Sequence, residues 1–238
     1  MKLSQQQRQF NAAMERYNSG TRYRLFGTAV SLTNLSLQIY VLWRVWPHSI
    51  GVAWQVIALF AAYLITDFLN GLVHIYMDNN DSYDSLAGPL IANFHMHHKI
   101  PQYKKRNLLF VYFNESGSKI WLVPYLAAVA LLPELFATNS IVMYILVYVG
   151  ILSSVAEVSH YLCHSSTSGT VIFLEKTGLL LSKRHHAKHH LKDNTSYAFL
   201  NGFSDPLLDL IASRFCKGYK QTTDLHFAKY VLPETESR

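Results

Sequence analysis

Charged residues are scarce in this 238-residue sequence. Asp, Glu, Lys and Arg make up 15% of it, against roughly 25% in soluble domains, and half of the residues are hydrophobic. The hydrophobic residues form four long runs, at about 25–46, 52–73, 120–137 and 141–163. Each run is close to the roughly 20 residues that cross a bilayer core as a helix. We predict an all-α integral membrane protein of one domain, a bundle of about four transmembrane helices. Because Pro124 and Pro133 interrupt the third run, we expect that run to be bent or partly re-entrant.

Cysteine is also scarce, and two further features are absent. Two cysteines make no disulfide framework and argue against thiolate zinc sites and iron–sulfur clusters. No Gly-x-Gly-x-x-Gly fingerprint is present, so we do not expect the chain to bind a dinucleotide itself. Residues 1–24 lack the apolar core of a cleavable signal peptide. We expect residues 1–24 and 224–238 to be polar terminal segments.

Histidine, in contrast, is concentrated. All of the 12 histidines except His48 and His226 lie in four clusters: His74 with Asp78 one turn later; His95, His97 and His98; His160 and His164; and His185, His186, His189 and His190. If the last cluster is helical, its residues form two pairs spaced four apart on one side of the helix. One such run fits a solvated basic surface equally well, but four runs favour a metal site.

The basic residues indicate where the four clusters lie. With four spans, both termini and the segment between the second and third spans share one side. Of the 21 Lys and Arg residues, only Arg44 approaches the other side. By the positive-inside rule the first side is cytosolic, in the endoplasmic reticulum or a bacterial inner membrane, and it holds all four clusters. The net charge of +6 therefore indicates topology and contact with anionic headgroups rather than nucleic-acid binding.

The number of candidate ligands exceeds what one metal ion uses. A structural zinc site takes four ligands and a catalytic zinc site three, whereas the clusters offer enough for two ions. Nitrogen-rich sites with an occasional carboxylate suit non-haem iron, and some of the residues must orient the ligands instead of binding metal. A haem with two axial histidines would leave most of the clusters unexplained.

Four segments resemble elements of the Kua-type lipid desaturases, which belong to the membrane histidine-box di-iron enzymes. The family includes plasmanylethanolamine desaturases and plant desaturases that act on phosphatidylglycerol. Residues 71–78 are similar to its Gly-x-x-His-x-x-x-Asp element and residues 97–101 to its His-His-x-x-Pro element. Residues 160–164 match His-x-x-x-His, and residues 185–190 match His-His-x-x-His-His. Residues 197–209 resemble the plant branch, and the whole resemblance covers about residues 60–212.

The resemblance implies an O2-dependent desaturase that inserts a double bond into a membrane lipid chain, either a plasmanyl ether or a phospholipid acyl chain. It implies two iron ions, held among His74, Asp78, His97, His98, His160, His164, His185, His186, His189 and His190. Electrons would come from a partner such as cytochrome b5 or ferredoxin. The basic loop Lys104-Lys105-Arg106 would serve as a docking surface for that partner or as a headgroup contact.

Three alternatives remain open at this point. A lipid hydroxylase would use the same ligands, because the ligand types do not distinguish hydroxylation from desaturation. A metal transporter would need polar residues at the middle of the spans, but residues 57–62 and 145–150 are essentially apolar. A metal-sensing protein would bind the ions without turnover.

Overall fold

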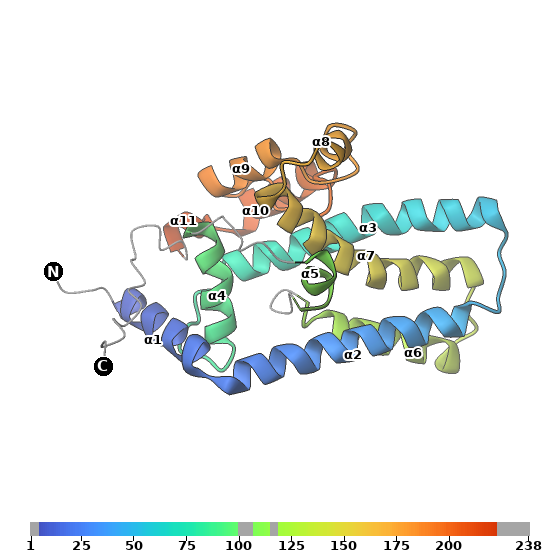
Figure 1. Ribbon diagram of the computed structural model, residues 1–238, viewed down its shortest axis with the longest axis horizontal. Helices are drawn as coiled ribbons and strands as arrows, with labels where there is room; N and C mark the ends of the chain where they lie inside the picture. Colours follow the sequence, from blue (N-terminus) through green and yellow to red (C-terminus); the bar gives the residue numbers. More distant parts are fainter. Residues whose placement is uncertain (1–4, 100–106, 115–118, 223–238) are drawn as a thin grey trace.

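Long helices form one part of the molecule, and most of the short helices gather toward its other end (Figure 1). The computed structural model describes residues 5–99, 107–114 and 119–222, and within these ranges it contains α-helices and no strand, which confirms the all-α prediction. The long helices are α2 (Thr21–Val45), α3 (Val52–Asp78) and α7 (Ser140–Ser165). The shorter ones are α1 (Gln5–Ser19), α4 (Gly88–Lys99), α5 (Leu108–Asn114), α6 (Leu122–Leu135), α8 (Gly169–Lys176), α9 (Lys183–Leu191), α10 (Asp205–Phe215) and α11 (Tyr219–Thr222).

The three long helices of the described chain are long and apolar enough to cross a membrane. They contain 25, 27 and 26 residues, or about 37–40 Å at 1.5 Å per residue, whereas a bilayer core is roughly 30 Å thick. The predicted third span is shorter than expected, because α6 has 14 residues and a length of about 21 Å. A four-span arrangement therefore stays a prediction.

The core among the long helices is apolar near the α2–α3 turn and polar closer to the short helices. Val45, Leu126 and Val147 are buried where α2, α6 and α7 meet. Nearer the short helices, Gln38 Nε2 donates to the carbonyl of Gly150 at 2.9 Å and to Ser154 Oγ at 3.0 Å, which ties α2 to α7. Because lipid offers no hydrogen-bond partners, such polar groups must be satisfied inside the bundle.

Two helices carry histidine clusters near their ends or along their length: α3 extends past its apolar run to Asp78, and α9 covers the 185–190 cluster. The apolar run that begins at Val52 was expected to end near residue 73, but α3 continues to Asp78 and so carries its last ligand candidates one turn apart. The 185–190 cluster is helical, which is the condition under which its residues form pairs four apart. Its helix α9 begins after Ser182, whose hydroxyl accepts a hydrogen bond from the backbone N–H of His185 as an N-cap.

Five of the short helices form a cap near the ends of α3 and α7 that carry the histidines (Figure 1). We use "cap" for α4, α8, α9, α10 and α11. Leu208 and Ala212 of α10 pack against Ile75 of α3 in one buried cluster. The polar N-terminal segment forms helix α1, whose buried Phe10 lies in a cluster with Ile91 of α4. Within the cap, α4 thus lies beside α3 and α9 beside α7.

Candidate metal centre

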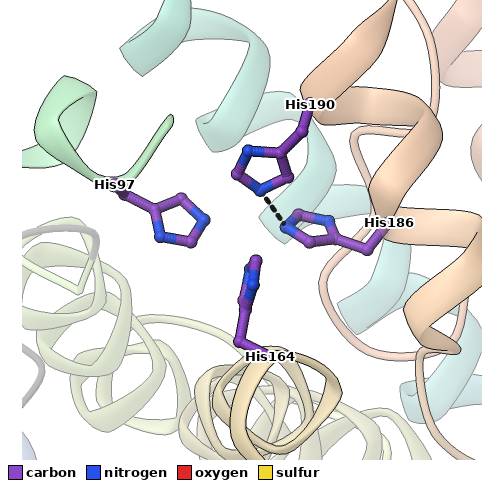
Figure 2. Close-up of side chains that lie close together, drawn as sticks. All are labelled: His97, His164, His186 and His190. Atoms are coloured by element: carbon purple, nitrogen blue, oxygen red, sulfur yellow. Dashed lines mark hydrogen bonds between the residues drawn. The ribbon is translucent and has the colours of Figure 1, made fainter. Parts of the chain in front are cut away.

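Two groups of four potential ligands lie at the cap end of α3 and α7. Within each group, one ligand atom of every residue lies within 4.8 Å of those of the others. We call the first group the carboxylate cluster: His74, Asp78, His98 and His189. We call the second group the imidazole cluster: His97, His164, His186 and His190. Figure 2 shows the four rings of the imidazole cluster turned toward a common space.

Helices α4 and α9 each contribute to both clusters. His97 belongs to the imidazole cluster and His98 to the carboxylate cluster, because consecutive residues of a helix point about 100° apart. On α9, His186 and His190 stand one turn apart on the same face and share the imidazole cluster, whereas His189 points to the carboxylate cluster. The two clusters are therefore neighbours joined through two helices.

The carboxylate cluster is built around the side chain of Asp78. His98 Nε2 lies 2.9 Å from Asp78 Oδ1, while His74 Nε2 and His189 Nε2 lie 3.3 Å and 3.2 Å from Oδ2. All four side chains are 0–1% exposed. His74 stands 22 residues after Val52, or about 33 Å along α3, so the cluster begins just beyond a 30 Å bilayer core that starts at Val52.

The outer nitrogens of two rings fix their tautomers. His74 Nδ1 lies 2.7 Å from the Tyr197 carbonyl and His189 Nδ1 lies 3.1 Å from the Thr195 carbonyl. Because a carbonyl oxygen only accepts, each Nδ1 carries the proton, and in the neutral ring the lone pair is on Nε2. Both Nε2 atoms are buried without a hydrogen-bond partner and face the Asp78 carboxylate. Lone pairs facing a carboxylate in a buried space fit a bound cation.

The imidazole cluster is crowded with nitrogen atoms. His186 Nε2 lies 3.0 Å from His190 Nε2, which Figure 2 marks with a dashed line. The Nδ1 atoms of both rings are buried without a hydrogen-bond partner. Burial, and then the neighbouring imidazoles, hold the pKa values of His97 and His186 well below the usual range and lower the pKa of His190 to about 2. Neutral rings with converging nitrogens are the form that binds a metal.

His160 lies at the edge of the imidazole cluster. Its Nε2 atom is 3.0 Å from His186 Nε2 and 3.1 Å from His97 Nε2. Its ring stacks on Phe199 with a centroid distance of 4.2 Å and an interplanar angle of 8°. The position suits a fifth ligand of that cluster or a residue that orients His97 and His186.

His185, like His160, is a predicted ligand that belongs to neither group of four, and unlike His160 its nearest partner is a residue outside both clusters. Its Nε2 atom lies 2.5 Å from Asp205 Oδ2, and its side chain is 29% exposed. The other oxygen of Asp205 accepts the backbone N–H of Ala198 at 2.9 Å. His185 thus connects α9 to the first residue of α10, which in turn holds the segment before that helix.

His95 of α4 belongs to the second histidine cluster of the sequence but was not among the predicted ligands. Both of its ring nitrogens form hydrogen bonds with protein groups. Its Nε2 donates to the carbonyl of Met77 at 2.8 Å, and its Nδ1 then accepts from the hydroxyl of Tyr83 at 2.7 Å. Burial lowers its pKa to about 4. This neutral ring links α4 to the end of α3, which helps to position His97 and His98.

Asp67 is a site-building residue that the sequence pattern did not reveal. Its buried carboxylate accepts the backbone N–H groups of Leu200, Asn201 and Ser204 at 2.9–3.1 Å, and the Ser204 hydroxyl at 2.7 Å. The segment held in this way carries Phe199 and the carbonyl of Tyr197 that orients His74. An aspartate inside an apolar run was the available signal, because ionisable residues within spans are functional candidates.

Part of the sequence-based predictions lies outside the described residues. These are the basic loop Lys104-Lys105-Arg106, Pro101 of the second element, His226 and the C-terminal segment.

One comparison with known proteins bears on this site. A family model described as the lipid desaturase domain matches residues 63–217, a stretch that contains every member of both clusters. No curated protein and no solved structure matches the chain.

Proposed function

Because the chain belongs to the lipid desaturase domain family, we propose that it is a membrane-bound oxidoreductase with a non-haem di-iron centre. The proposed reaction uses O2 and two electrons from an external donor to convert a CH2–CH2 unit of a membrane lipid chain into a double bond. With two protons from solvent, the two hydrogens removed and the O2 leave as two molecules of water. The proposed substrate is a plasmanyl ether chain or a phospholipid acyl chain.

The pair of neighbouring clusters is the observation that carries this proposal. Eight ligand candidates, seven of them imidazoles, converge in two adjacent buried groups. Two divalent ions would be held by residues of these groups: one by His74, Asp78, His98 and His189, the other by His97, His164, His186 and His190, with His160 beside it. A structural zinc site would use only one such group.

The ligand types favour iron. Imidazole with an occasional carboxylate suits non-haem iron that activates O2, and neither cluster contains a cysteine. When bound, the iron pair supplies the oxidising power for removing hydrogen from an unactivated C–H bond.

The chain's own residues prepare the site in three ways. Burial keeps the imidazoles of His186 and His190 neutral, so they are ready to bind metal without first losing a proton. The carbonyls of Thr195 and Tyr197 fix the tautomers of their partner histidines. The stacked Phe199 ring closes one side of His160 and keeps water away from it.

The topology that we propose for the centre follows the positive-inside rule. Both termini and the cap face the cytosol, and the turns near Ser49 and Asn139 face the opposite side. This arrangement lets a soluble or membrane-anchored donor such as cytochrome b5 or ferredoxin reach the cap.

Single cysteines introduced at Ser49 and Asn139 should react with an impermeant maleimide from outside, whereas a cysteine at Lys188 should not. Labelling at Lys188 from outside would contradict the assignment.

Lipid profiling by mass spectrometry tests the proposed reaction. Cells that express the protein should accumulate a lipid that has lost two hydrogens relative to cells that express His97→Ala. An added oxygen instead would identify a hydroxylase. No lipid change in cells whose purified protein carries iron would favour a metal-sensing role.

A further inference from the structure

Helix α10 packs one side against the bundle and exposes an apolar opposite side. Leu208 is buried against α3 so closely that a Cβ atom added at Gly71 would lie 2.2 Å from Leu208 Cδ1. On the other side, Leu207 and Leu210 are 51% and 48% exposed. Phe215, which ends the helix seven residues after Leu208, is 82% exposed. A soluble cap would not be expected to gather such residues on one helix.

The contact with α3 gives the depth of α10. Gly71 lies 19 residues after Val52, or about 29 Å along the helix. The exposed Trp43, Trp46 and Trp54 cluster in sequence around the start of α3, as tryptophans do at a membrane–water interface. A core of roughly 30 Å measured from that end finishes at the level where α10 contacts α3. Helix α10 therefore lies at the bilayer boundary and not above it.

The segment after α8 reaches deeper along α3. The hydroxyl of Tyr63 donates to the carbonyl of Leu179 at 2.8 Å. Tyr63 is 11 residues after Val52, or about 17 Å along the helix, so the turn after α8 contacts α3 on the core side of the α10 contact. Two apolar side chains are exposed here as well: Phe173 is 62% and Leu179 52% exposed.

Basic residues flank these apolar side chains. Lys176 ends α8, Arg214 lies in the last turn of α10, and Lys217 follows it; all three are exposed. Long basic side chains beside an apolar helix face are typical of helices that lie in a membrane interface, where the charged ends contact anionic headgroups.

We propose that α8, the turn after it and α10 form a membrane-embedded rim of the cap. We call this surface the lipid rim and define it by Phe173, Leu179, Leu207, Leu210 and Phe215. Its apolar side chains lie among the lipid chains of the leaflet on the cap side, and Lys176, Arg214 and Lys217 bind anionic lipid phosphates. The lipid rim continues the exposed apolar surface of α3, where Phe60 is 63% exposed.

Fluorescence quenching from two directions tests the lipid rim. The full chain, with Cys163→Ser and Cys216→Ser, is reconstituted with iron in vesicles of phosphatidylcholine and phosphatidylglycerol. Single cysteines at Leu179→Cys, Leu210→Cys and, as the control on the exposed face of α9, Lys188→Cys carry a bimane label. Brominated phosphatidylcholine reports contact with lipid chains, and iodide reports contact with water.

We expect brominated lipid to quench the labels at 179 and 210 several-fold more than the label at 188, and iodide to show the reverse order. Iodide quenching at 179 and 210 equal to that at 188 would overturn the proposal. Protection of 179 and 210 from both quenchers would also overturn it, because it would show that protein, such as a second copy of the chain, covers the surface. Neither measurement requires turnover, so this result is independent of whether the chain desaturates a lipid.

Discussion

The carboxylate cluster and the imidazole cluster differ in closure and in charge. All four members of the carboxylate cluster are buried, whereas in the imidazole cluster only His186 is buried and the other three are partly exposed. Asp78 gives the first cluster a negative charge that offsets a bound cation, and the second cluster offers only neutral rings. Two sites that share α4 and α9 are thus expected to bind metal with different strength.

The partners of the outer nitrogens differ in the same direction. In the carboxylate cluster, His74 and His189 are each held by a backbone carbonyl of the segment before α10. In the imidazole cluster, the outer Nδ1 atoms of His186 and His190 are buried without a hydrogen-bond partner. We infer that the carboxylate cluster would be the more firmly held half of the proposed centre and the imidazole cluster the less firmly held half.

Removing a central ring of the imidazole cluster should have the largest effect. His186→Ala deletes a buried ligand whose Nε2 atom contacts two other imidazoles, so iron should dissociate from this half and desaturation should fall below detection. Product is measured by lipid mass spectrometry. The matched control is His48→Ala, which removes an exposed histidine from the turn at the far end of α2 and should retain full activity. A fully active His186→Ala protein would remove this residue from the centre.

Chelation should separate the two clusters without mutation. An iron(II) chelator added to reduced protein is expected to remove iron in two phases, because the imidazole cluster is more exposed and lacks a carboxylate. The phases are followed by the absorbance of the chelate. A single phase that removes both ions together would show that the clusters do not differ in the way described.

Weakening the support of the carboxylate cluster should have an intermediate effect. Asp67→Asn replaces a buried carboxylate that accepts five hydrogen bonds from the 200–204 segment. We expect a loss of about 1–3 kcal/mol in the free energy of unfolding. We also expect iron affinity to fall by about 10–100-fold, mainly in the slow chelation phase. Ser204→Ala, which removes only one of these donors, should cost much less; equal losses would argue against a role of the Asp67 charge.

The smallest effect at the centre is expected for His185. Because His185 contacts Asp205 and neither cluster, His185→Gln should retain both iron ions and lose less than about 10-fold in activity. Metal analysis of the purified variant makes the distinction. Loss of one iron ion would make His185 a ligand, as its position in the 185–190 cluster suggested.

The sequence reveals which elements build the centre but not how their residues divide. The spacing of the last cluster indicated ligand pairs on condition that the stretch is helical, and α9 meets that condition. The assignment of His97 and His98 to different clusters depends on how α4 is rotated against α3 and α7, which is set by Tyr83, Met77 and α1. The two members of the predicted pair at 185 and 189 separate for a similar reason, since Asp205, far away in sequence, contacts the first of them.

The limits of the fold prediction have equally specific causes. Hydropathy located the three long helices because long apolar runs are a strong signal. It overestimated the third run, where a helix of 14 residues contains Pro133. It also did not reveal that Gln38 and Ser154 pair inside the bundle, because hydrogen bonding between helices depends on their packing and leaves no periodic pattern.

Iron analysis of the wild-type chain and of Asp78→Asn tests the central claim most directly. After anaerobic reconstitution with iron(II) and removal of unbound metal, the wild-type protein should contain close to two iron ions per chain. Asp78→Asn should contain about one, because the loss of the carboxylate empties the carboxylate cluster and leaves the imidazole cluster intact. One zinc ion and no redox-active iron in the wild-type protein, or two iron ions in Asp78→Asn, would contradict a two-cluster di-iron centre.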